Sequence, residues 1–381
     1  IHIQTTNYGY QYSQNLIKKA AEALSQLCSD NRILFKPHEN SFIYYILDYK
    51  DQNELVDFSN EIIKILEALF VTDRIGGGIG ILEMDPEETN IELILRRLLI
   101  ASERSVNVLE KDFDICFYDD ELEALVNRER DIVEVLNAIA AADDTNGDLY
   151  LQYQPIIDLK KGSVFGFEAL ARIRNEKLGF VSPLEFIPVA EKTKLILPIG
   201  EKVIIKAFNF LSRLKEQGYK DICVTINISA IQLLQPDFTD RLFELMDEMH
   251  IDPKSIGIEI TESVFISDLG KINNIIDKLR KSGIFISIDD FGIGYSSLAR
   301  ERDLNVDCLK IDKHFIDKLM HIDLSKAITS DIISMSHKLG HFIVAEGVEH
   351  KRQLMYLKEH DCDKIQGYLI SRPLYDNDAL D

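Results

Sequence analysis

Residues 284–290 read IFISIDD, a short apolar, β-branched run that ends in two adjacent carboxylates. Similar runs recur at 222–228, 255–260, 308–311 and 342–345, with amphipathic segments between them. Runs of this length are typical of buried strands, and the amphipathic segments have the period of helices. This βα alternation, sustained over roughly 230 residues, predicts a parallel α/β barrel or an open doubly wound sheet.

The first part of the chain has a less regular pattern. Helix-period segments at 11–28, 53–70 and 90–109 alternate with strand-like runs at 33–35, 42–47, 79–82 and 113–118. This alternation predicts a smaller α+β domain over residues 1–118. Residues 119–142 read as one amphipathic helix, which a polar cluster at 143–148 ends. We therefore place a helical linker at 119–148 and a second domain at 149–381.

Composition limits the partners and the location of the chain. With 43 Lys and Arg against 64 Asp and Glu, the net charge of −21 argues against broad binding to DNA, RNA or anionic membrane. No stretch is apolar for long enough to cross a bilayer. The chain begins at Ile1 without a basic and apolar leader, so we expect membrane contact only through an upstream region. Five scattered cysteines without a CxxC pair favour reduced thiols in the cytoplasm.

Polar residues gather at the ends of the expected strands. The runs carry or end in carboxylates, an amide and an amine: Glu168, Asn227, Glu259, Asp289, Asp290, Lys310 and Glu346. Catalytic groups collect at the C-terminal ends of parallel strands, so we expect these side chains to converge. Taken alone, each carboxylate or amide is more typical of a capped turn, and Lys310 is more typical of an ordinary salt bridge in the barrel. Capped turns and single salt bridges do not explain the whole series of polar residues at strand ends.

A buried cluster of carboxylates strongly opposes its own ionisation. Either several of the carboxylates are protonated, or positive charge is bound among them. Oxygen ligands without His or Cys favour Mg²⁺ or Mn²⁺, and the adjacent pair Asp289 and Asp290 suits two ions. Two neighbouring ions are a common solution for displacement at phosphorus, which makes a phosphodiester the expected substrate. Lys310 would then steady the water or the phosphate, and Glu346 would accept the water's proton.

Two other patterns indicate less chemistry. His337 and His341 lie four residues apart without an HExxH pattern, so we expect both at the surface. The glycine-rich run at 76–80 lacks the Lys-Ser/Thr of a P-loop and is more typical of a tight turn entering a strand.

The second domain resembles a known family through a series of ordered motifs. They are YQPI at 153–156, EAL at 168–170, NIS at 227–229, EITES at 259–263, DDFG at 289–292, KID at 310–312, AEGVE at 345–349 and QGY at 366–368. Together they resemble the EAL-domain phosphodiesterases of bacterial cyclic di-GMP signalling. The resemblance implies a TIM-like (β/α)8 barrel that hydrolyses this second messenger to linear pGpG with two Mg²⁺ or Mn²⁺ ions. It also implies a homodimer formed through the barrel.

The metal-binding and catalytic positions of the family fall on the strand-end residues. The implied metal ligands are Glu168, Asn227, Glu259, Asp289 and Asp290, the last of which serves the second ion. The implied catalytic residues are Lys310 and Glu346, which hold and deprotonate water, and Gln366, which supports the site.

The resemblance also implies substrate contacts and a regulatory loop. The implied substrate-binding residues are Gln154, Leu170 and Arg172. Glu262 corresponds to the residue that anchors the loop at 291–298, which in the family helps to place the metals. In that loop Ile293 replaces the usual Thr, a change that concerns loop regulation rather than metal binding.

The first domain more loosely resembles a GGDEF domain, the nucleotide-cyclase-like partner often fused upstream of EAL. NYGY at 7–10 and GIGI at 78–81 fit, but the signature position reads HENSF at 38–42, without its glycines and acidic pair. Ser29 and Arg32 stand where the inhibitory Arg-x-x-Asp site should lie. The resemblance therefore implies a degenerate, non-catalytic domain that regulates or dimerises, with GTP or another guanine nucleotide as the ligand to expect.

Two functions from different classes follow. The leading hypothesis is a metal-dependent cyclic di-GMP phosphodiesterase, because the set of ligands and water-handling residues is complete. The main alternative is a catalytically silent receptor that binds cyclic di-GMP and relays the binding to a partner. A dimerising scaffold without either activity would leave the carboxylate cluster unexplained.

Overall fold

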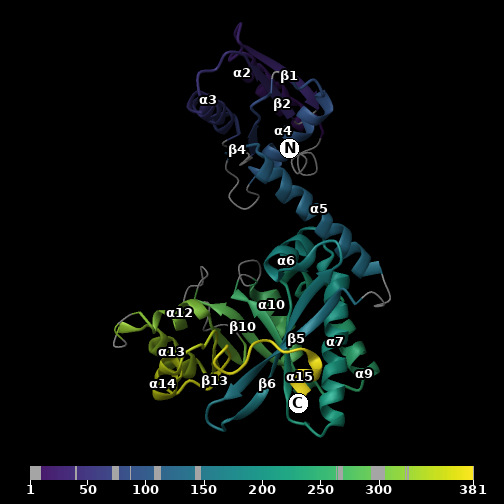
Figure 1. The fold of residues 1–381 in the computed structure, drawn as a ribbon, viewed down its shortest axis with the longest axis vertical. Coiled ribbons are helices and arrows are strands. Elements are labelled where there is room, and N and C mark those ends of the chain that lie inside the picture. The colour runs from purple at the N-terminus through teal and green to yellow at the C-terminus, as the bar shows by residue number, and fades with distance from the viewer. Residues whose placement is uncertain are drawn as a thin grey trace. The chain divides into compact units, whose positions relative to one another are not determined.

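The computed structural model describes residues 10–38, 41–70, 77–85, 87–106, 113–141, 147–262, 264, 269–292, 305–321, 323 and 326–380. Residues 7–9, 39–40, 76, 107–109, 142–146, 263 and 293–298, which belong to the patterns predicted from the sequence, lie outside these ranges. The chain divides into two compact units, residues 1–128 and 129–381, whose helices and strands are drawn in Figure 1.

The smaller unit alternates helices with strands. Its elements are α2 (Tyr10–Ser25), β1 (Arg32–His38), β2 (Ser41–Ile46), α3 (Gln52–Phe70), β3 (Gly77–Ile81), α4 (Ile91–Arg104) and β4 (Phe113–Phe117). β1 and β2 form an antiparallel hairpin, whereas β3 and β4 pair in parallel. The helices and strands expected over this part of the chain are therefore confirmed.

A hydrophobic core joins the hairpin to α2 and α3. Leu24 of α2 and Phe58 of α3 are buried with Leu34 of β1 and Tyr44 of β2 packed against them. The rings of Tyr44 and Phe58 meet edge to face, with centroids 5.0 Å apart. Because side chains alternate along a strand, one face of the hairpin supplies this apolar surface.

The glycine run lies within a strand. Residues 77–80 belong to β3, so the tight turn expected there is wrong. A Cβ atom on Gly80 would lie 2.5 Å from the backbone nitrogen of Ser102 in α4. The missing side chain therefore lets α4 pack directly on the backbone of β3.

Helix α5 (Asp120–Ala141) spans the boundary between the units. Near its start, Leu122 is buried with Ile100 and Ala101 of α4. Near its end, Val135 and Leu136 belong to the core of the larger unit. Each end of this helix therefore contributes to a hydrophobic core.

Among the described residues of the larger unit, eight strands form a closed barrel in the order β5-β13-β12-β11-β10-β9-β8-β6, with β6 pairing back to β5. They are β5 (Leu149–Asp158), β6 (Ser163–Asn175), β8 (Cys223–Asn227), β9 (Ile256–Thr261), β10 (Phe285–Phe291), β11 (Cys308–Ile311), β12 (Phe342–Ala345) and β13 (Lys364–Ile365). The short β7 (Gly179–Val181) pairs with β6. The closed barrel agrees with the TIM-like expectation, and the open doubly wound sheet is excluded.

One strand departs from a strict (β/α)8 repeat. β5 runs antiparallel to both of its neighbours, β6 and β13, whereas the other pairings around the ring are parallel. The turn at 159–162 joins β5 directly to β6, and strands joined by so short a connection pair in the antiparallel sense. Gln152 and Gln154 of β5 therefore lie toward the end of the barrel where the parallel strands finish.

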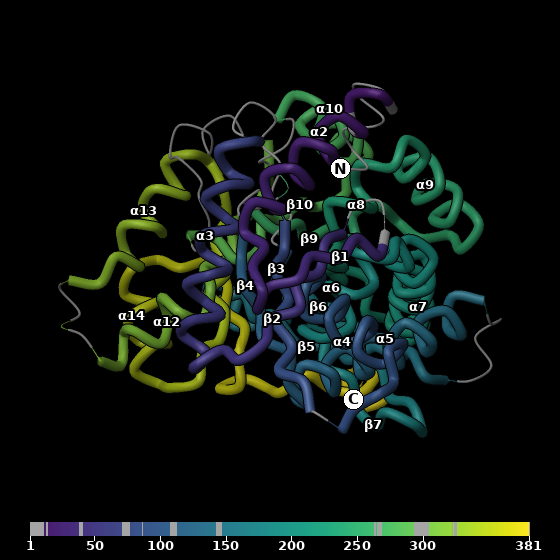
Figure 2. Tube along the Cα trace, turned by 90° about the horizontal axis from the view of Figure 1, so that it is seen from above, coloured from purple at the N-terminus to yellow at the C-terminus, as the bar shows by residue number. Residues whose placement is uncertain are grey.

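Helices cover the outside of the barrel. They are α6 (Pro183–Lys192), α7 (Ile196–Glu216), α8 (Ala230–Leu233), α9 (Phe238–Glu248), α10 (Leu269–Ser282), α12 (Lys313–Lys318), α13 (Thr329–Leu339), α14 (Lys351–Glu359) and α15 (Asp376–Leu380), with a 3₁₀ turn at Pro253–Ser255. Figures 1 and 2 both place α7 and α9 along one flank and α12, α13 and α14 along another. None of the described helices combines the length and the apolar composition needed to cross a bilayer.

The apolar strand residues fill the layer between barrel and helices. Ile258 and Ile260 of β9, and Ile286 and Ile288 of β10, are all buried in the main core. Because side chains alternate along a strand, the intervening positions, such as Glu259, face the barrel interior. The same pattern that packs the helices thus directs polar residues inward.

The two histidines considered above lie in different environments. His337 is exposed on α13, whereas His341 is buried and its Nδ1 lies 2.9 Å from the carbonyl oxygen of Val306. Gly340 ends α13 with a left-handed backbone (φ 86°) and turns the chain back toward β12. The surface expectation is therefore wrong for His341.

Asp363 connects three elements near the start of β13. Its Oδ2 lies 2.8 Å from His337 Nε2 and accepts from the backbone N–H of Ile343 at 3.1 Å. Its Oδ1 accepts from Lys160 Nζ at 3.1 Å. Burial opposes the ionisation of Asp363, but the hydrogen bonds from His337 and Lys160 outweigh it and lower its pKa.

We expect Asp363→Ala to lower the free energy of unfolding by about 2–4 kcal/mol at neutral pH, because the buried N–H of Ile343 loses its acceptor. Lys160→Ala should cost less than about 1 kcal/mol, since that ammonium is largely exposed. Because the pKa of Asp363 is lowered in the fold, its stabilisation is lost as the pH falls below about 4. Denaturant titrations at neutral and acid pH measure both effects, and equal losses for the two variants would contradict the expectation.

Candidate metal centre and active site

Neighbouring barrel strands bring the polar strand-end residues to one end of the barrel. Glu168 lies in β6, Asn227 ends β8, Glu259 lies in β9, Asp289 and Asp290 lie in β10, Lys310 lies in β11, and Glu346 and Gln366 directly follow β12 and β13. In the parallel registers, Asn227 lies opposite Glu259, and Asp289 lies opposite Thr261. Residues far apart in sequence thus converge because successive parallel strands end at the same edge.

Lys310 lies at the centre of this group. Its Nζ is 2.6 Å from Glu259 Oε2 and 3.2 Å from Glu168 Oε2. The same nitrogen is 2.5 Å from Glu346 Oε1 and 3.5 Å from Asp289 Oδ1. With the Lys310 side chain only 1% exposed, one ammonium faces four carboxylates away from bulk water.

The carboxylate of Glu168 is held by several donors. Asn227 Nδ2 donates to its Oε1 at 2.7 Å, and Gln366 Nε2 donates to its Oε2 at 2.6 Å. Gln366 Nε2 also donates to Gln154 Oε1 at 3.0 Å. Burial opposes the ionisation of Glu168, but Lys310 and the two amides outweigh it and lower its pKa. Glu168 is thus an ionised carboxylate in a fixed orientation, as a metal ligand requires.

The remaining carboxylates repel one another. Burial and the charge of Glu168 raise the pKa of Glu259 well above its ordinary value. Burial raises the pKa of Glu346 to about 8, with Lys310 opposing the shift. Burial also disfavours the charged form of Lys310, but the carboxylates, Asp289 first among them, raise its pKa well above the usual range. One ammonium is therefore not enough to neutralise this cluster, and the site favours additional cations.

A β-bulge lies at the two aspartates of β10. The pairing of β10 with β11 shifts register here, and carboxylate oxygens of Asp289 and Asp290 lie within 4.8 Å of one another and of Glu346. Adjacent side chains of a regular strand point to opposite faces. Asp290 instead has a left-handed backbone (φ 56°), a conformation that Asp tolerates better than most residues. Burial and the charge of Asp289 raise the pKa of Asp290 to about 6.

Two overlapping groups of carboxylates have the spacing of a metal site. The first is Glu168, Glu259 and Asp289, and the second is Asp289, Asp290 and Glu346, with the ligand oxygens of each group within 4.8 Å of one another. Asp289 belongs to both groups. Glu346 was expected only as a proton acceptor, and its position also suits a ligand of the second ion. Oxygen donors of this kind favour Mg²⁺ or Mn²⁺.

The residues expected to contact substrate lie on adjacent strands. Glu168, Leu170 and Arg172 occupy alternate positions of β6 and so share one face. Arg172 Nε donates to Gln152 Oε1 at 2.9 Å, which fixes the guanidinium beside the acidic centre. Gln152 was not among the expected site residues. Its position two residues before Gln154 on β5 is the sequence signal that identifies it.

Glu262 lies just beyond the acidic centre. It is buried, and its Oε2 accepts a hydrogen bond from the backbone N–H of Gly292 at 3.2 Å. This contact joins the end of β9 to the start of the loop expected at 291–298. Since residues 293–298 lie outside the described ranges, the anchoring role stays a prediction.

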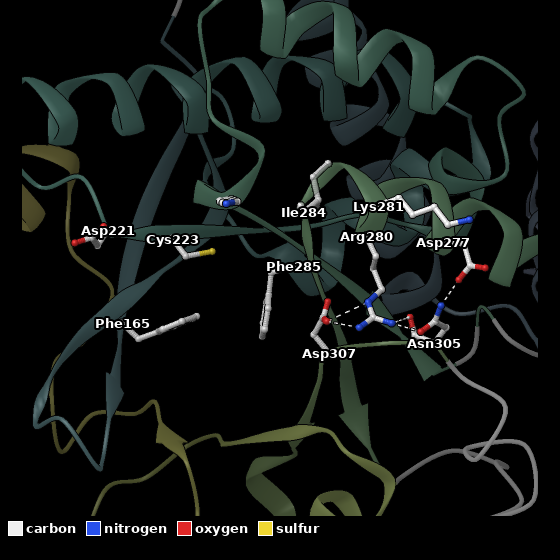
Figure 3. A pocket seen from close by; sticks show the side chains of 12 residues that line it. Phe165, Asp221, Cys223, Asp277, Arg280, Lys281, Ile284, Phe285, Asn305 and Asp307 are labelled. Atoms are coloured by element: carbon white, nitrogen blue, oxygen red, sulfur yellow. Dashed lines mark hydrogen bonds and ion pairs between the residues drawn. The ribbon is translucent and has the colours of Figure 1, made fainter.

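A separate cavity of about 510 Å³ lies at the other end of the barrel. Figure 3 shows the side chains that line it. Its lining includes Cys223 and Phe285, the first residues of β8 and β10. Arg280 Nη2 donates to Asp307 Oδ1 at 2.6 Å, and Asp307 Oδ2 accepts from the backbone N–H of Ile286 at 2.9 Å. These bonds fix the start of β10, and the cavity is distinct from the acidic site.

Comparison with known proteins identifies the family of the barrel. Residues 134–373 match the family model described as the EAL domain. A Pseudomonas aeruginosa protein named a cyclic di-GMP phosphodiesterase is 29% identical over 370 residues, which cover 96% of this chain and 62% of that protein. The signaling protein YkoW of Bacillus subtilis is 32% identical over 377 residues, which cover 96% of this chain and 46% of YkoW.

Among solved structures, one described as PaMucR phosphodiesterase in a c-di-GMP complex superposes with a TM-score of 0.60 at 34% identity. The match covers 67% of this chain and 99% of that chain. The chain spans about half the length of three curated relatives that it matches over 96% of its residues, from 46% to 62%. Because the family model covers more than half of its residues, the chain belongs to the EAL domain family.

Proposed function

We propose that the barrel is a metal-dependent phosphodiesterase that hydrolyses cyclic di-GMP to linear pGpG. The observation that carries this proposal is the single ammonium of Lys310 among four buried or half-buried carboxylates at the C-terminal ends of the strands. Relatives named as cyclic di-GMP phosphodiesterases, and a related phosphodiesterase described in complex with c-di-GMP, support the choice of substrate.

Two ions fit the donors that the barrel presents. Glu168, Asn227, Glu259 and Asp289 would hold the first, and Asp289, Asp290 and Glu346 would hold or face the second. When bound, the ions would offset the charge of the phosphate oxygens and make water a stronger nucleophile. The all-oxygen donor set supports Mg²⁺ or Mn²⁺.

Glu346 and Lys310 are placed to handle the attacking water. Burial raises the pKa of Glu346 to about 8, which suits a proton acceptor that works near neutral pH. Lys310, with its Nζ 2.5 Å from Glu346 Oε1, orients that carboxylate. The water oxygen forms a new bond to phosphorus, and Glu346 takes the water's proton. The bond from phosphorus to one ribose oxygen breaks, that oxygen takes up a proton, and the ring opens to the linear dinucleotide.

Arg172 supplies positive charge on the substrate side of the site. Gln152 holds its Nε, so the guanidinium presents its remaining N–H groups in a defined direction, as recognition of a phosphate requires. Leu170, on the same face of β6 and half-buried, offers apolar surface to a guanine. Gln154 also lies on the substrate side of the site. Its Nε2 donates to the carbonyl oxygen of Ser371, and its Oε1 accepts from Gln366.

The smaller unit is proposed to be a degenerate GGDEF-like domain that regulates or dimerises without synthesising cyclic di-GMP. The antiparallel pairing of His38 in β1 with Ser41 in β2 involves two residues of the degenerate signature and supports this reading. Binding of GTP or another guanine nucleotide to this unit, a homodimer formed through the barrel, and a cytoplasmic location belong to the same proposal.

Incubation of the chain with cyclic di-GMP and Mg²⁺ or Mn²⁺ tests the activity. We expect pGpG to accumulate, as followed by chromatography, and a chelator such as EDTA to stop its formation, because the carboxylates alone lack the positive charge that the reaction needs. Tight binding of cyclic di-GMP without turnover in either metal would instead establish the receptor, which relays ligand binding to a partner.

A further inference from the structure

A fully buried glutamine supports the segment that carries Glu346. Gln353 lies in the first turn of α14 and is 0% exposed. Its Oε1 accepts from the backbone N–H groups of Glu349 and His350, both at 2.8 Å. Its Nε2 donates to the carbonyl oxygen of Ile316 at 3.0 Å. One side-chain amide therefore joins the segment 346–350 to helix α12.

The segment 346–350 is fixed at both ends. The backbone N–H of Glu346 donates to the carbonyl oxygen of Ile311, at the end of β11, at 3.0 Å. The N–H of Val348 donates to the carbonyl oxygen of Gln366 at 3.0 Å. Gln353 adds side-chain hydrogen bonds to these contacts with neighbouring strands, and it links the segments that follow β11 and β12. Those two strands place Lys310 and Glu346.

Helix capping alone does not account for these bonds. At the start of α8, Ser229 and Gln232 form a capping box in which Gln232 reaches back to the N–H of Ser229. Gln353 makes the same bond to His350, and in addition it bonds Glu349 and reaches Ile316 in another helix. An amide at this position is required because a single group must accept from two N–H groups and donate to a carbonyl oxygen.

We propose that Gln353 is a positioning residue, which sets the place of the Glu346 carboxylate relative to Lys310 by fixing the segment 346–350. This inference rests on the proposed phosphodiesterase function. The residues expected to contact substrate lie on β5 and β6 and make no bond to Gln353. Loss of the amide therefore impairs the chemical step more than substrate binding.

Gln353→Met tests the inference, because methionine has a similar volume and makes none of the three bonds. We expect kcat for cyclic di-GMP hydrolysis to fall by about 10- to 100-fold at saturating metal, since misplacement of a catalytic group by about 1 Å has effects of this size. KM should stay within about threefold. Backbone amide exchange at residues 349 and 350 should become faster. Gln353→Glu, which keeps the acceptor, should retain more of kcat than Gln353→Met.

Leu357→Ala is the matched control on the same helix. Leu357 is 0% exposed, so its truncation leaves a cavity and lowers the melting temperature, but it makes no bond to the segment 346–350. At a temperature where both variants are folded, its kcat should stay within about twofold of that of the unmodified chain. Equal kcat for Gln353→Met and the unmodified chain would overturn the inference alone. Absence of turnover by the unmodified chain would overturn the proposed function and, with it, this role.

Discussion

Replacing Glu168 with alanine is expected to lower the rate of cyclic di-GMP hydrolysis by about a thousandfold or more. Glu168 is the carboxylate that the fold keeps ionised, because Lys310, Asn227 and Gln366 all bond it. Its loss removes a ligand of the first carboxylate group and leaves the amide of Asn227 and the buried amide of Gln366 without their shared acceptor. Single-turnover measurements at increasing Mn²⁺ concentration would record both the lower rate and the greater metal requirement.

Glu191→Ala is a suitable control for this experiment. Burial raises the pKa of Glu191, as it does for Glu259 and Glu346, but Glu191 lies on α6 and belongs to neither carboxylate group. Its removal should leave the rate within about twofold of the unmodified value. Near-normal turnover by Glu168→Ala would remove Glu168 from the mechanism.

Replacing Lys310 with methionine is expected to lower the free energy of unfolding of the metal-free protein by about 3–5 kcal/mol at neutral pH. The substitution removes the ammonium from among Glu168, Glu259, Asp289 and Glu346, so that buried carboxylates repel one another without compensation. Added Mg²⁺ or Mn²⁺ should restore more stability to the variant than to the unmodified chain, because the ions replace the missing charge. Denaturant titrations with and without metal measure this difference.

Lys364→Met provides the matched comparison. Lys364 is also buried in the barrel, but its Nζ lies over the rings of Phe165 and Phe342, at 4.4 and 4.5 Å from their centroids. A cation–π contact of a desolvated ammonium is worth about 2 kcal/mol, and its loss should not respond to metal. If Lys310→Met behaved like Lys364→Met in both respects, the charge balance assigned to Lys310 would be wrong.

The residue types of the site and their positions at strand ends could be predicted from the order of residues along the chain. Apolar runs such as 256–260 and 284–288 alternate with helices, and a carboxylate stands in the first of these runs and just after the second. Parallel strands end at one edge, so this order is enough to predict that Glu259 and Asp289 meet. Residue type then favours hard divalent ions over zinc. The expectation that α and β segments alternate in the first unit also held, since it rests on local periodicity.

Other features of the site depend on contacts between distant residues. The direction of β5 follows from its pairing with β6 and β13, and this direction brings Gln152 and Gln154 to the acidic end. The bulge at Asp289 and Asp290 arises in the pairing of β10 with β11. Neither leaves a mark in local periodicity, because register is a property of two strands together.

The sequence by itself determined the chemical identity of the centre: carboxylates, one amide and one lysine placed where strands end. Only the tertiary structure decided that Lys310 bonds several carboxylates at once, that Glu346 joins the second acidic group, and that Gln353 supports the segment carrying Glu346. The physical reason is the separation along the sequence over which each feature is determined. Strand ends are set by hydrophobic periodicity over a few residues, whereas distances between side chains on different strands are set by closure of the barrel.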